Sequence, residues 1–240
     1  MASALARGWG DPVLVYDAYR PRAEALVEQL GGEVVASNGE LAQRADAVLL
    51  AHKPAGLERV AAEVGGAAKG VISILGGVPL AALRAAYGAT PVVRMIPSVP
   101  VEVRQGVTCH ARDAEPTSAE LEAEAIALFE RVGLVVSLDE AQMDVATGLM
   151  SCAPAYVALV AEAQVDAGVR AGLPADVAGE LVAANIGGTA ALLQARGMDT
   201  LAVRRAVTSP GGITARGLAA LERGGVRAAF DDAMQAVLAR

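Results

Sequence analysis

The feature that most constrains the fold of this chain is a regular alternation of short apolar runs and amphipathic stretches, which fills residues 1–139 and then stops. The apolar runs predict strands, and the stretches between them predict helices, the first of which opens the chain with no strand before it. The expected strands are 12–16, 33–36, 46–51, 71–75, 92–96, 106–111 and 134–138. This spacing predicts right-handed crossovers and a parallel sheet, so the first half is expected to be α/β.

From residue 140 onward the alternation is absent, and apolar positions recur at helical spacing instead. The expected helices are 142–150, 154–171, 175–194, 200–206, 211–223 and 226–239. A narrow stripe of small side chains is typical of two closely packed helices, and here it consists of Tyr156, Leu159, Val160, Ala163 and Ala167. The pattern is compatible with a bundle inside one chain and with burial against a second copy. We expect two domains, 1–139 and 140–240.

Polar and glycine residues follow several of the expected strands. In a doubly wound sheet, ligands bind where the carboxyl ends of the parallel strands meet. The residues at these ends are Asp17, Asn38, His52, Lys53, Pro54, Leu75, Gly76 and Ser98. An acidic residue that closes the second strand of a dinucleotide fold binds the ribose 2′-hydroxyl, and Asp17 fits that role. The matching glycine-rich loop belongs roughly 20 residues earlier, which places it before Met1.

Residues 207–218 form the segment that says most about chemistry. Ser209 suits a helix N-cap, and Pro210 suits the first helical position. The two glycines that follow would leave backbone N–H groups exposed at the positive end of the helix dipole, where carboxylates and phosphates bind. Thr214 adds a hydroxyl that both donates and accepts hydrogen bonds. The segment predicts an anion site with a proton-handling neighbour; a tight turn whose glycines only relieve crowding is the alternative.

Composition bears on the partners of the chain. The formal net charge is −7 and the basic residues are scattered, which disfavours a nucleic-acid partner. Cys109 and Cys152 lie far apart without zinc-like spacing, so reduced thiols and no metal site are expected. His52 and His110 have no carboxylate or cysteine at ligand spacing, and neither is expected to do chemistry. No signal peptide is recognised, and charged residues are expected to interrupt every apolar run short of a membrane span; a soluble cytoplasmic protein is predicted.

The run from Val207 to Leu218 continues with Leu221-Glu222 and Gly224-Gly225-Val226-Arg227, and together they resemble the C-terminal signature of the pyrroline-5-carboxylate reductase family. The resemblance implies an NAD(P)H-dependent oxidoreductase that reduces 1-pyrroline-5-carboxylate to proline. It implies an α/β Rossmann-like dinucleotide-binding domain followed by an all-α dimerisation domain, which forms a homodimer or larger homo-oligomer with the active site between the two domain types. The implied small-molecule contacts are Ser209, Gly211, Gly212, Ile213 and Thr214, with the Thr214 hydroxyl as the catalytic group on the imine nitrogen.

The same resemblance extends to the cofactor. Members of the family open with a strand and a Gly-x-Gly-Asn-Met-Ala-x-Ala turn, whereas this sequence begins Met1-Ala2-Ser3-Ala4. It is therefore expected to lack the first, central strand and two pyrophosphate-facing glycines, through a start codon assigned too far downstream or a genuine loss of cofactor binding. The implied cofactor contacts are Met1, Ala2, Asp17, Asn38, Ala51, His52, Lys53, Pro54, Leu75, Gly76 and Ser98.

Departures from the family pattern leave alternatives open. Members that use NADP tend to carry an arginine after the residue that matches Asp17, whereas this chain has Ala18, so the carboxylate favours NAD; Arg20 and Arg22 keep NADP open. Ser98 stands in place of an asparagine, and residues 150–153 read Met-Ser-Cys-Ala in place of Ser-Gly-Ser-Gly. An oxidoreductase for another cyclic imine or keto acid, or a cofactor-free dimeric binding or regulatory protein, would also account for these features.

Overall fold

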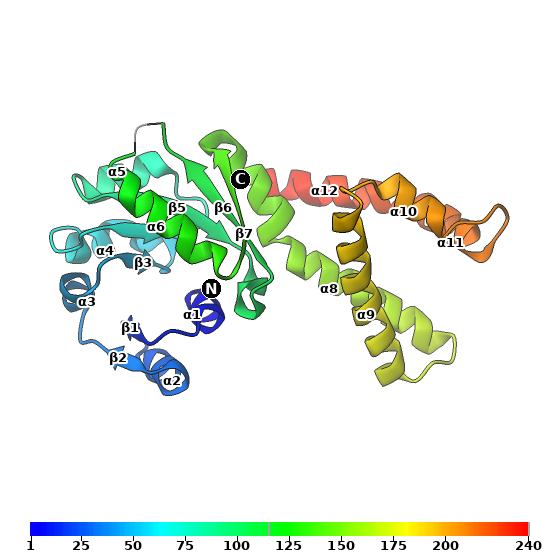
Figure 1. The fold of residues 1–240 in the computed structure, drawn as a ribbon, viewed down its shortest axis with the longest axis horizontal. Helices are drawn as coiled ribbons and strands as arrows, with labels where there is room; N and C mark the ends of the chain where they lie inside the picture. The colour runs from blue at the N-terminus through cyan, green and yellow to red at the C-terminus, as the bar shows by residue number, and fades with distance from the viewer. Residues whose placement is uncertain (115, 240) are drawn as a thin grey trace. The chain divides into compact units, whose positions relative to one another are not determined.

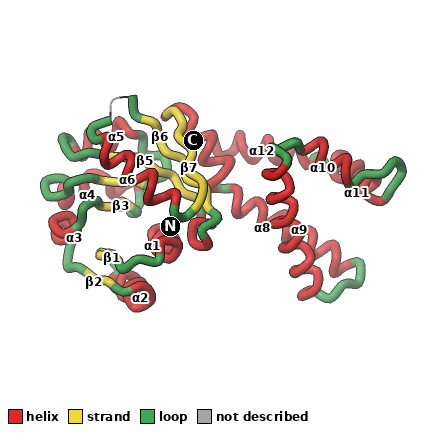
Figure 2. The backbone as a smooth tube through the Cα atoms, viewed as in Figure 1, coloured by secondary structure: helices red, strands yellow, loops and turns green. Residues whose placement is uncertain are grey.

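The computed structural model describes residues 1–114 and 116–239, and the chain divides into two compact units, Met1–Pro154 and Ala155–Arg240. The first unit combines helices with strands, and the described part of the second is built from helices and the turns that join them (Figures 1 and 2). The predicted change from α/β to all-helical structure is therefore confirmed. The predicted domain bounds of 1–139 and 140–240 differ from this division, because the helical run that starts at residue 140 begins within the first unit.

The first unit alternates helices with strands in the predicted order. Its elements are α1 (Ala2–Trp9), β1 (Val13–Val15), α2 (Arg20–Leu30), β2 (Gly32–Val34), α3 (Asn38–Arg44), β3 (Val48–Leu50), η1 (Pro54–Gly56), α4 (Leu57–Val64), β4 (Val71–Ser73), α5 (Leu80–Tyr87), β5 (Val92–Pro97), η2 (Val99–Val103), β6 (Gly106–Arg112), α6 (Ala119–Glu130) and β7 (Gly133–Asp139). Every strand predicted for this half is present. Hydrophobic periodicity alone was thus sufficient to place them.

The strands form two sheets. β1 pairs with β2 in parallel, and the larger sheet has the order β3-β4-β5-β6-β7. Within the described residues no strand lies between β1 and β3, so each of these strands has one edge without a strand partner. Figure 1 shows β1 and β2 set apart from β3.

One strand pair departs from the predicted parallel sheet. β3, β4 and β5 are parallel to one another, but β6 runs antiparallel to β5. The connection between them, residues 98–105, contains the short helix η2 and no full crossover helix. Parallel neighbours need a crossover of about a dozen residues or more, so this connection turns the chain back on itself. α6 then supplies the crossover that makes β7 parallel to β6.

Two hydrophobic clusters cover the two faces of the larger sheet. Val71 belongs to the cluster with residues of α4 and α5, whereas Ile72, the next residue of β4, belongs to the cluster with residues of α1 and α6. This alternation follows from the two-residue period of a strand. On the α1 side the Trp9 ring meets Phe129 edge-on at 5.5 Å between centroids, and its indole N–H donates to the Leu128 carbonyl at 2.9 Å. Both faces of the larger sheet are therefore covered by packed helices.

The remaining elements are helical. They are η3 (Glu140–Gln142), α7 (Met143–Ala146), the π-helix η4 (Thr147–Ser151), α8 (Ala153–Arg170), α9 (Ala175–Ala195), α10 (Thr200–Ala206), α11 (Ile213–Arg223) and α12 (Val226–Leu238). The six predicted helices are recognisable, although the first is split into the turns η3, α7 and η4. Pro174 precedes α9 as its N-cap, and Gly172 has a φ of +105° in the turn after α8, which matches the stop and start predicted there.

Apolar side chains remain largely exposed in the helical unit of this single chain. Among its described residues Ala178 and Val203 are the buried apolar ones, whereas Leu159 is 64% exposed. The helical run Glu140–Arg170 is long and apolar enough to cross a membrane by length and composition alone. The prediction that charged residues interrupt every apolar run well short of a span is wrong here, since no charged residue lies between Asp144 and Glu162. An extensive apolar helical face that its own unit does not cover is equally typical of a protein interface.

Candidate functional site

The start of α11 lies in a tight turn that differs in detail from the prediction. The Gly212 N–H donates to the Ser209 carbonyl at 3.0 Å, and Gly211 has a φ of +70°. Pro210 at the second position and a left-handed glycine at the third are the signature of a type II turn. The helix therefore begins at Ile213 with Gly212 as its N-cap. The predictions of Ser209 as N-cap and Pro210 as first helical residue are wrong, because the turn precedes the helix.

This turn decides which backbone amides are free. The Gly212 amide is engaged by Ser209, and the first helical amide to bond back is that of Arg216, which donates to the Gly212 carbonyl at 3.3 Å. The amides of Ile213, Thr214 and Ala215 therefore lack helical partners, and the glycine N-cap supplies no side chain to cap them. Three unpaired N–H groups at a helix N-terminus form a binding site for an anion. Of the two glycine amides in the prediction, that of Gly212 is taken up by the turn, and the first helical turn adds three further donors.

A side chain at Gly212 would be crowded by Ser209. A Cβ atom on this residue would lie 2.3 Å from the Ser209 hydroxyl oxygen and 3.1 Å from the Ser209 carbonyl oxygen. At Gly211 a Cβ atom would meet nothing within 4 Å, but its left-handed φ disfavours other residues. The two glycines therefore form the turn for different reasons: Gly212 avoids crowding against Ser209, and Gly211 permits the left-handed backbone.

The Thr214 hydroxyl is available for chemistry. It lies in the first turn of α11, is half-buried, and makes no hydrogen bond to any described residue. The neighbouring Thr208 hydroxyl, by contrast, donates to the Arg204 carbonyl at 2.6 Å. A hydroxyl beside three free amides can bind a ligand that carries both a carboxylate and a polar nitrogen. Ile213, which is 80% exposed, adds an apolar surface next to them.

A second candidate region follows the parallel strands of the larger sheet. Residues 51–54 follow β3, Leu75 and Gly76 follow β4, and Ser98 follows β5, so the topology brings these segments to one edge. Gly76 is exposed, and a Cβ atom there would meet nothing within 4 Å, so a ligand can approach its backbone. Leu75 is buried in the core and offers only its backbone.

His52 contributes to the same edge. Its Nδ1 lies 2.8 Å from the Lys53 carbonyl oxygen, while its Nε2 is buried without a hydrogen-bond partner among the described residues. A buried polar atom without a partner carries a desolvation cost that a bound polar group would relieve. The segment after β3 therefore fits a polar ligand at the position predicted for the dinucleotide.

The residues predicted near the ribose of the cofactor already have partners within the chain. One Asp17 carboxylate oxygen accepts from the Tyr19 N–H at 2.7 Å, which leaves the other oxygen available for a ribose hydroxyl. The Asn38 amide donates to Glu63 at 2.6 Å. Arg20 bonds Glu24 at 2.7 Å, and the Arg22 guanidinium lies 5.4 Å from the centre of the Tyr19 ring. Neither arginine pairs with Asp17.

Ser98 has a structural role that the sequence did not indicate. It is buried, its hydroxyl accepts from the Val107 N–H at 2.9 Å, and its own N–H donates to the Val107 carbonyl at 2.9 Å. These bonds hold the junction between β5 and β6. Its hydroxyl proton remains to reach a ligand, so the cofactor contact stays a prediction.

Comparisons with known proteins decide the family. Residues 140–240 match the model for pyrroline-5-carboxylate reductase dimerisation, and residues 1–77 match that for coenzyme F420-dependent NADP oxidoreductases. The pyrroline-5-carboxylate reductase of a Synechocystis species is 37% identical over 96% of this chain and 86% of its own. That of Thermus thermophilus is 36% identical over 100% of this chain and 91% of its own. The chain belongs to the pyrroline-5-carboxylate reductase family.

Solved structures of the family share the fold. The Streptococcus pyogenes reductase matches with a TM-score of 0.90 and 29% identity, over 99% of this chain and 92% of its own. The Plasmodium falciparum pyrroline carboxylate reductase, solved with NADP bound, matches with a TM-score of 0.87 and 27% identity, over 98% of this chain and 90% of its own. The predicted Rossmann-like domain followed by an all-α dimerisation domain is confirmed, and so is the family inferred from residues 207–227.

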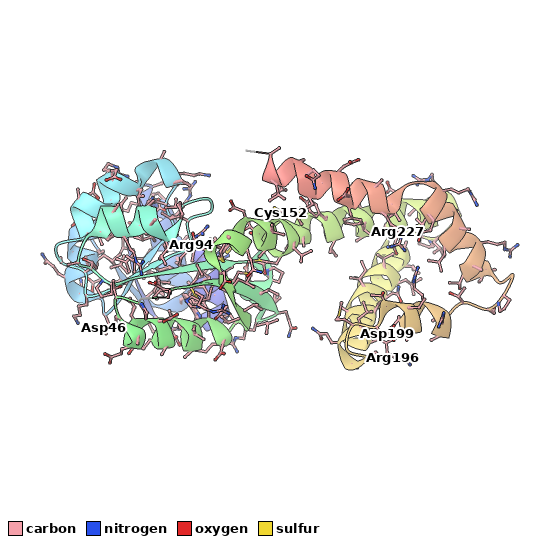
Figure 3. All side chains as sticks on the ribbon, turned by 90° about the horizontal axis from the view of Figure 1, so that it is seen from above. Asp46, Arg94, Cys152, Arg196, Asp199 and Arg227 are labelled. Carbon is pink, nitrogen blue, oxygen red and sulfur yellow. The ribbon has the colours of Figure 1, made fainter. Side chains whose placement is uncertain are left out.

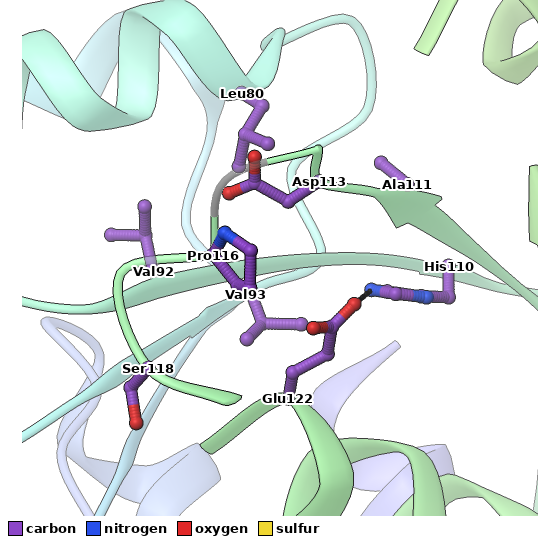
Figure 4. A pocket seen from close by; sticks show the side chains of 9 residues that line it. All are labelled: Leu80, Val92, Val93, His110, Ala111, Asp113, Pro116, Ser118 and Glu122. Carbon is purple, nitrogen blue, oxygen red and sulfur yellow. Dashed lines mark ion pairs between the residues drawn. The ribbon is translucent and has the colours of Figure 1, made fainter. Parts of the chain in front are cut away.

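His110 forms a cluster that the sequence did not indicate (Figure 4). Its Nδ1 lies 3.0 Å from the Ser137 hydroxyl, and its Nε2 lies 3.2 Å from a Glu122 carboxylate oxygen. Burial lowers the pKa of His110, and the Glu122 charge opposes that shift. Local spacing did not reveal these two partners, because α6 and β7 bring them to His110 from more distant parts of the chain. Among the described residues no group of three or more potential metal ligands occurs.

The two cysteines of this family member are free thiols, as predicted. Cys109 is buried in a cluster with Ile96, Ala111 and Met143, and burial raises the pKa of its thiol. A buried, protonated thiol is a poor nucleophile. Cys109 therefore serves as a small apolar residue of the core.

Proposed function

We propose that this chain reduces 1-pyrroline-5-carboxylate to L-proline with NAD(P)H, as a homodimer or a larger homo-oligomer. The observation that supports this most directly is the uncapped start of α11, where the free hydroxyl of Thr214 accompanies three free amides. Relatives with this activity in their names match along nearly the whole chain, which favours this reductase over an enzyme for another imine and over a cofactor-free protein.

The α11 start would bind the two polar groups of the substrate. The amides of Ile213, Thr214 and Ala215 hold the ring carboxylate, while the turn from Ser209 to Gly212 shapes the entrance. The Thr214 hydroxyl hydrogen-bonds the imine nitrogen, favours its protonated, electrophilic form and holds the proton that stays on the new amine. Bound NAD(P)H supplies the hydride. The remaining contribution of the protein is orientation, which brings the reacting carbon and the cofactor together.

The strand-end segments would bind the cofactor. Asp17 takes the ribose hydroxyls, and Asn38 with residues 51–54 lies along the dinucleotide. Leu75 and Gly76 lie beside the nicotinamide half, with Ser98 near it, and the amino end of α1 at Met1 and Ala2 approaches the pyrophosphate. A carboxylate at Asp17 repels a 2′-phosphate, and Arg20 and Arg22 are held by Glu24 and Tyr19, so NAD is the favoured cofactor.

Residues 1–139 would form the cofactor domain, and residues 140–240 would form the substrate and dimerisation domain. The second range is the one that the dimerisation family model matches. A second copy would cover the apolar faces of α8 and α9, which explains an apolar helical run without a membrane. We place the protein in the cytoplasm, with a small-molecule substrate and without a nucleic-acid or membrane partner, in keeping with its scattered basic residues.

Replacing Thr214 by valine tests the role of the hydroxyl. We expect kcat/KM for 1-pyrroline-5-carboxylate to fall roughly a hundred-fold, the contribution typical of a positioned proton-transfer group. Melting temperature and circular dichroism should be unchanged, because the hydroxyl has no partner among the described residues. Thr200→Val, in the first turn of α10, is the matched control and should retain full activity. Wild-type turnover by Thr214→Val would exclude the proposed role.

A further inference from the structure

Arg94 is a charged residue buried in the middle of a sheet. It lies in β5, is 3% exposed, and its register partner on β4 is Ser73 (Arg94 is labelled in Figure 3). Burial of an unpaired guanidinium is strongly unfavourable, so a partner must compensate for it. The residues on either side, Val93 and Met95, point into the cluster under α1 and α6. Arg94 therefore points to the opposite face of the sheet, the side of α5.

The partner of Arg94 is Glu140, which also caps a helix. The Arg94 Nη1 donates to a Glu140 carboxylate oxygen at 2.5 Å, and the same oxygen accepts from the Leu80 N–H at 3.1 Å. Leu80 is the first residue of α5, and its N-cap Pro79 supplies no side-chain hydrogen bond. Glu140 thus provides, from a distant part of the chain, the acceptor that a serine or aspartate N-cap would supply locally. Its negative charge also suits the positive end of the helix dipole.

This pair holds one end of a segment proposed to bind cofactor. Residues 74–79 join β4 to α5 and include Leu75 and Gly76. At the other end of the segment, the Ser73 hydroxyl accepts from the Leu75 N–H at 3.3 Å. Between the two anchors Gly77 has a φ of +74°, so the backbone turns sharply there. The conformation of Gly76 is therefore determined by contacts on both sides, one of which depends on Glu140.

We propose that Arg94 and Glu140 are positioning residues, which keep residues 74–79 in the conformation that binds the nicotinamide half of NAD(P)H. Arg94 fixes the Glu140 carboxylate, and Glu140 fixes the amino end of α5. Neither needs to touch the cofactor or the substrate. This inference rests on the proposed function for the identity of the ligand.

The test compares Glu140 with the acidic residue beside it. Asp139 bonds Arg112 at 2.7 Å in an exposed pair and also caps η3. Asparagine is an equally good N-cap, so Asp139→Asn removes one carboxylate charge while it keeps the cap, which makes it a matched control. Glu140→Ala removes the acceptor, and Glu140→Gln keeps an oxygen for Leu80 while it removes the charge. The measurements are the Kd for NAD(P)H from nucleotide fluorescence, the KM for the imine, and amide hydrogen exchange in residues 74–80.

We expect Glu140→Ala to raise the Kd for NAD(P)H about ten-fold, as loss of a partly buried hydrogen bond to a charged group predicts. Exchange in residues 74–80 should accelerate and the KM for the imine should not change. Glu140→Gln should give an intermediate affinity, and Asp139→Asn should match wild type. Unchanged affinity and exchange in Glu140→Ala, or an equal loss in Asp139→Asn, would overturn the inference. A wild type that binds NAD(P)H without reducing the imine would overturn the proposed substrate alone, because the affinity comparison still reports on Glu140.

Discussion

The two units of this protein use apolar residues in opposite ways. The first unit buries them in three clusters around its larger sheet, with Phe129, Leu83 and Met95 fully inaccessible. The described part of the second unit leaves Leu159, Leu181 and many others exposed. A sheet with helices on both faces covers itself, whereas a set of long helices with small-sided stripes covers itself only when other helices pack against it. The comparison indicates that the first unit is stabilised within one chain and the second between chains.

The largest effect is expected from a charge on the apolar face of α8. Leu159→Asp is expected to abolish the homo-oligomer, because a carboxylate buried at an interface without a partner costs several kcal/mol. Size-exclusion chromatography with light scattering measures the change. Leu134→Asp is the matched control: Leu134 in β7 is 61% exposed, close to the 64% of Leu159, yet lies in the self-covered unit. An oligomer that survives Leu159→Asp, or is lost in both variants, would contradict the assigned interface.

The two phenylalanines of the chain offer a comparison of intermediate size. Phe129 is 0% exposed and Phe230, in α12, is 50% exposed in the single chain. Phe129→Ala should lower the free energy of unfolding by about 3–5 kcal/mol, the usual cost of emptying a core site. Phe230→Ala should lower the free energy of unfolding by an amount that depends on protein concentration. The reason is that the exposed half of the Phe230 side chain becomes buried only when two copies associate. Denaturant unfolding at two protein concentrations distinguishes the variants; concentration dependence in Phe129→Ala alone would reverse the assignment.

The smallest effect concerns the pH dependence of the first unit. Burial lowers the pKa of His110 in the folded protein, while the unfolded chain retains the ordinary value of about 6.5. The unfolded state therefore binds more protons below that pH, so the stabilisation present above pH 6.5 is lost as the pH falls through the folded pKa. Melting temperature should fall more steeply below pH 6.5 in wild type than in His110→Gln. Parallel curves for the two proteins would show that His110 does not carry this dependence.

Much of the fold was predictable from local sequence patterns. The strands of the first unit follow from apolar runs bounded by glycine and proline, and the helical unit follows from a change of period at residue 140. Ser37 and Ser118 cap α3 and α6 through local hydrogen bonds of the kind that sequence reveals. The α11 start was found from its glycines, although its exact cap was not, because the turn type depends on backbone angles that Gly211 permits but does not impose.

Local sequence patterns do not predict contacts between distant segments. The antiparallel β6, the Ser98 bonds to β6 and the Glu122 partner of His110 all depend on which strands become neighbours. Arg94 could have been noticed as a charge inside an apolar strand, but nothing in the sequence pointed to Glu140 as its partner. The apolar run within Glu140–Arg170 is exposed because its own unit does not cover it, which local sequence patterns do not reveal.

The sequence by itself determined the elements, the family and the segment that carries the free amides and hydroxyl, because periodicity, turn residues and a long motif are local properties of the chain. Only the tertiary structure decided which amides stay unpaired beside Thr214, and only it revealed that a carboxylate sixty positions away caps α5. Hydrogen bonds and buried charges are satisfied by whatever lies nearby in space, and that neighbourhood exists only after the chain has folded.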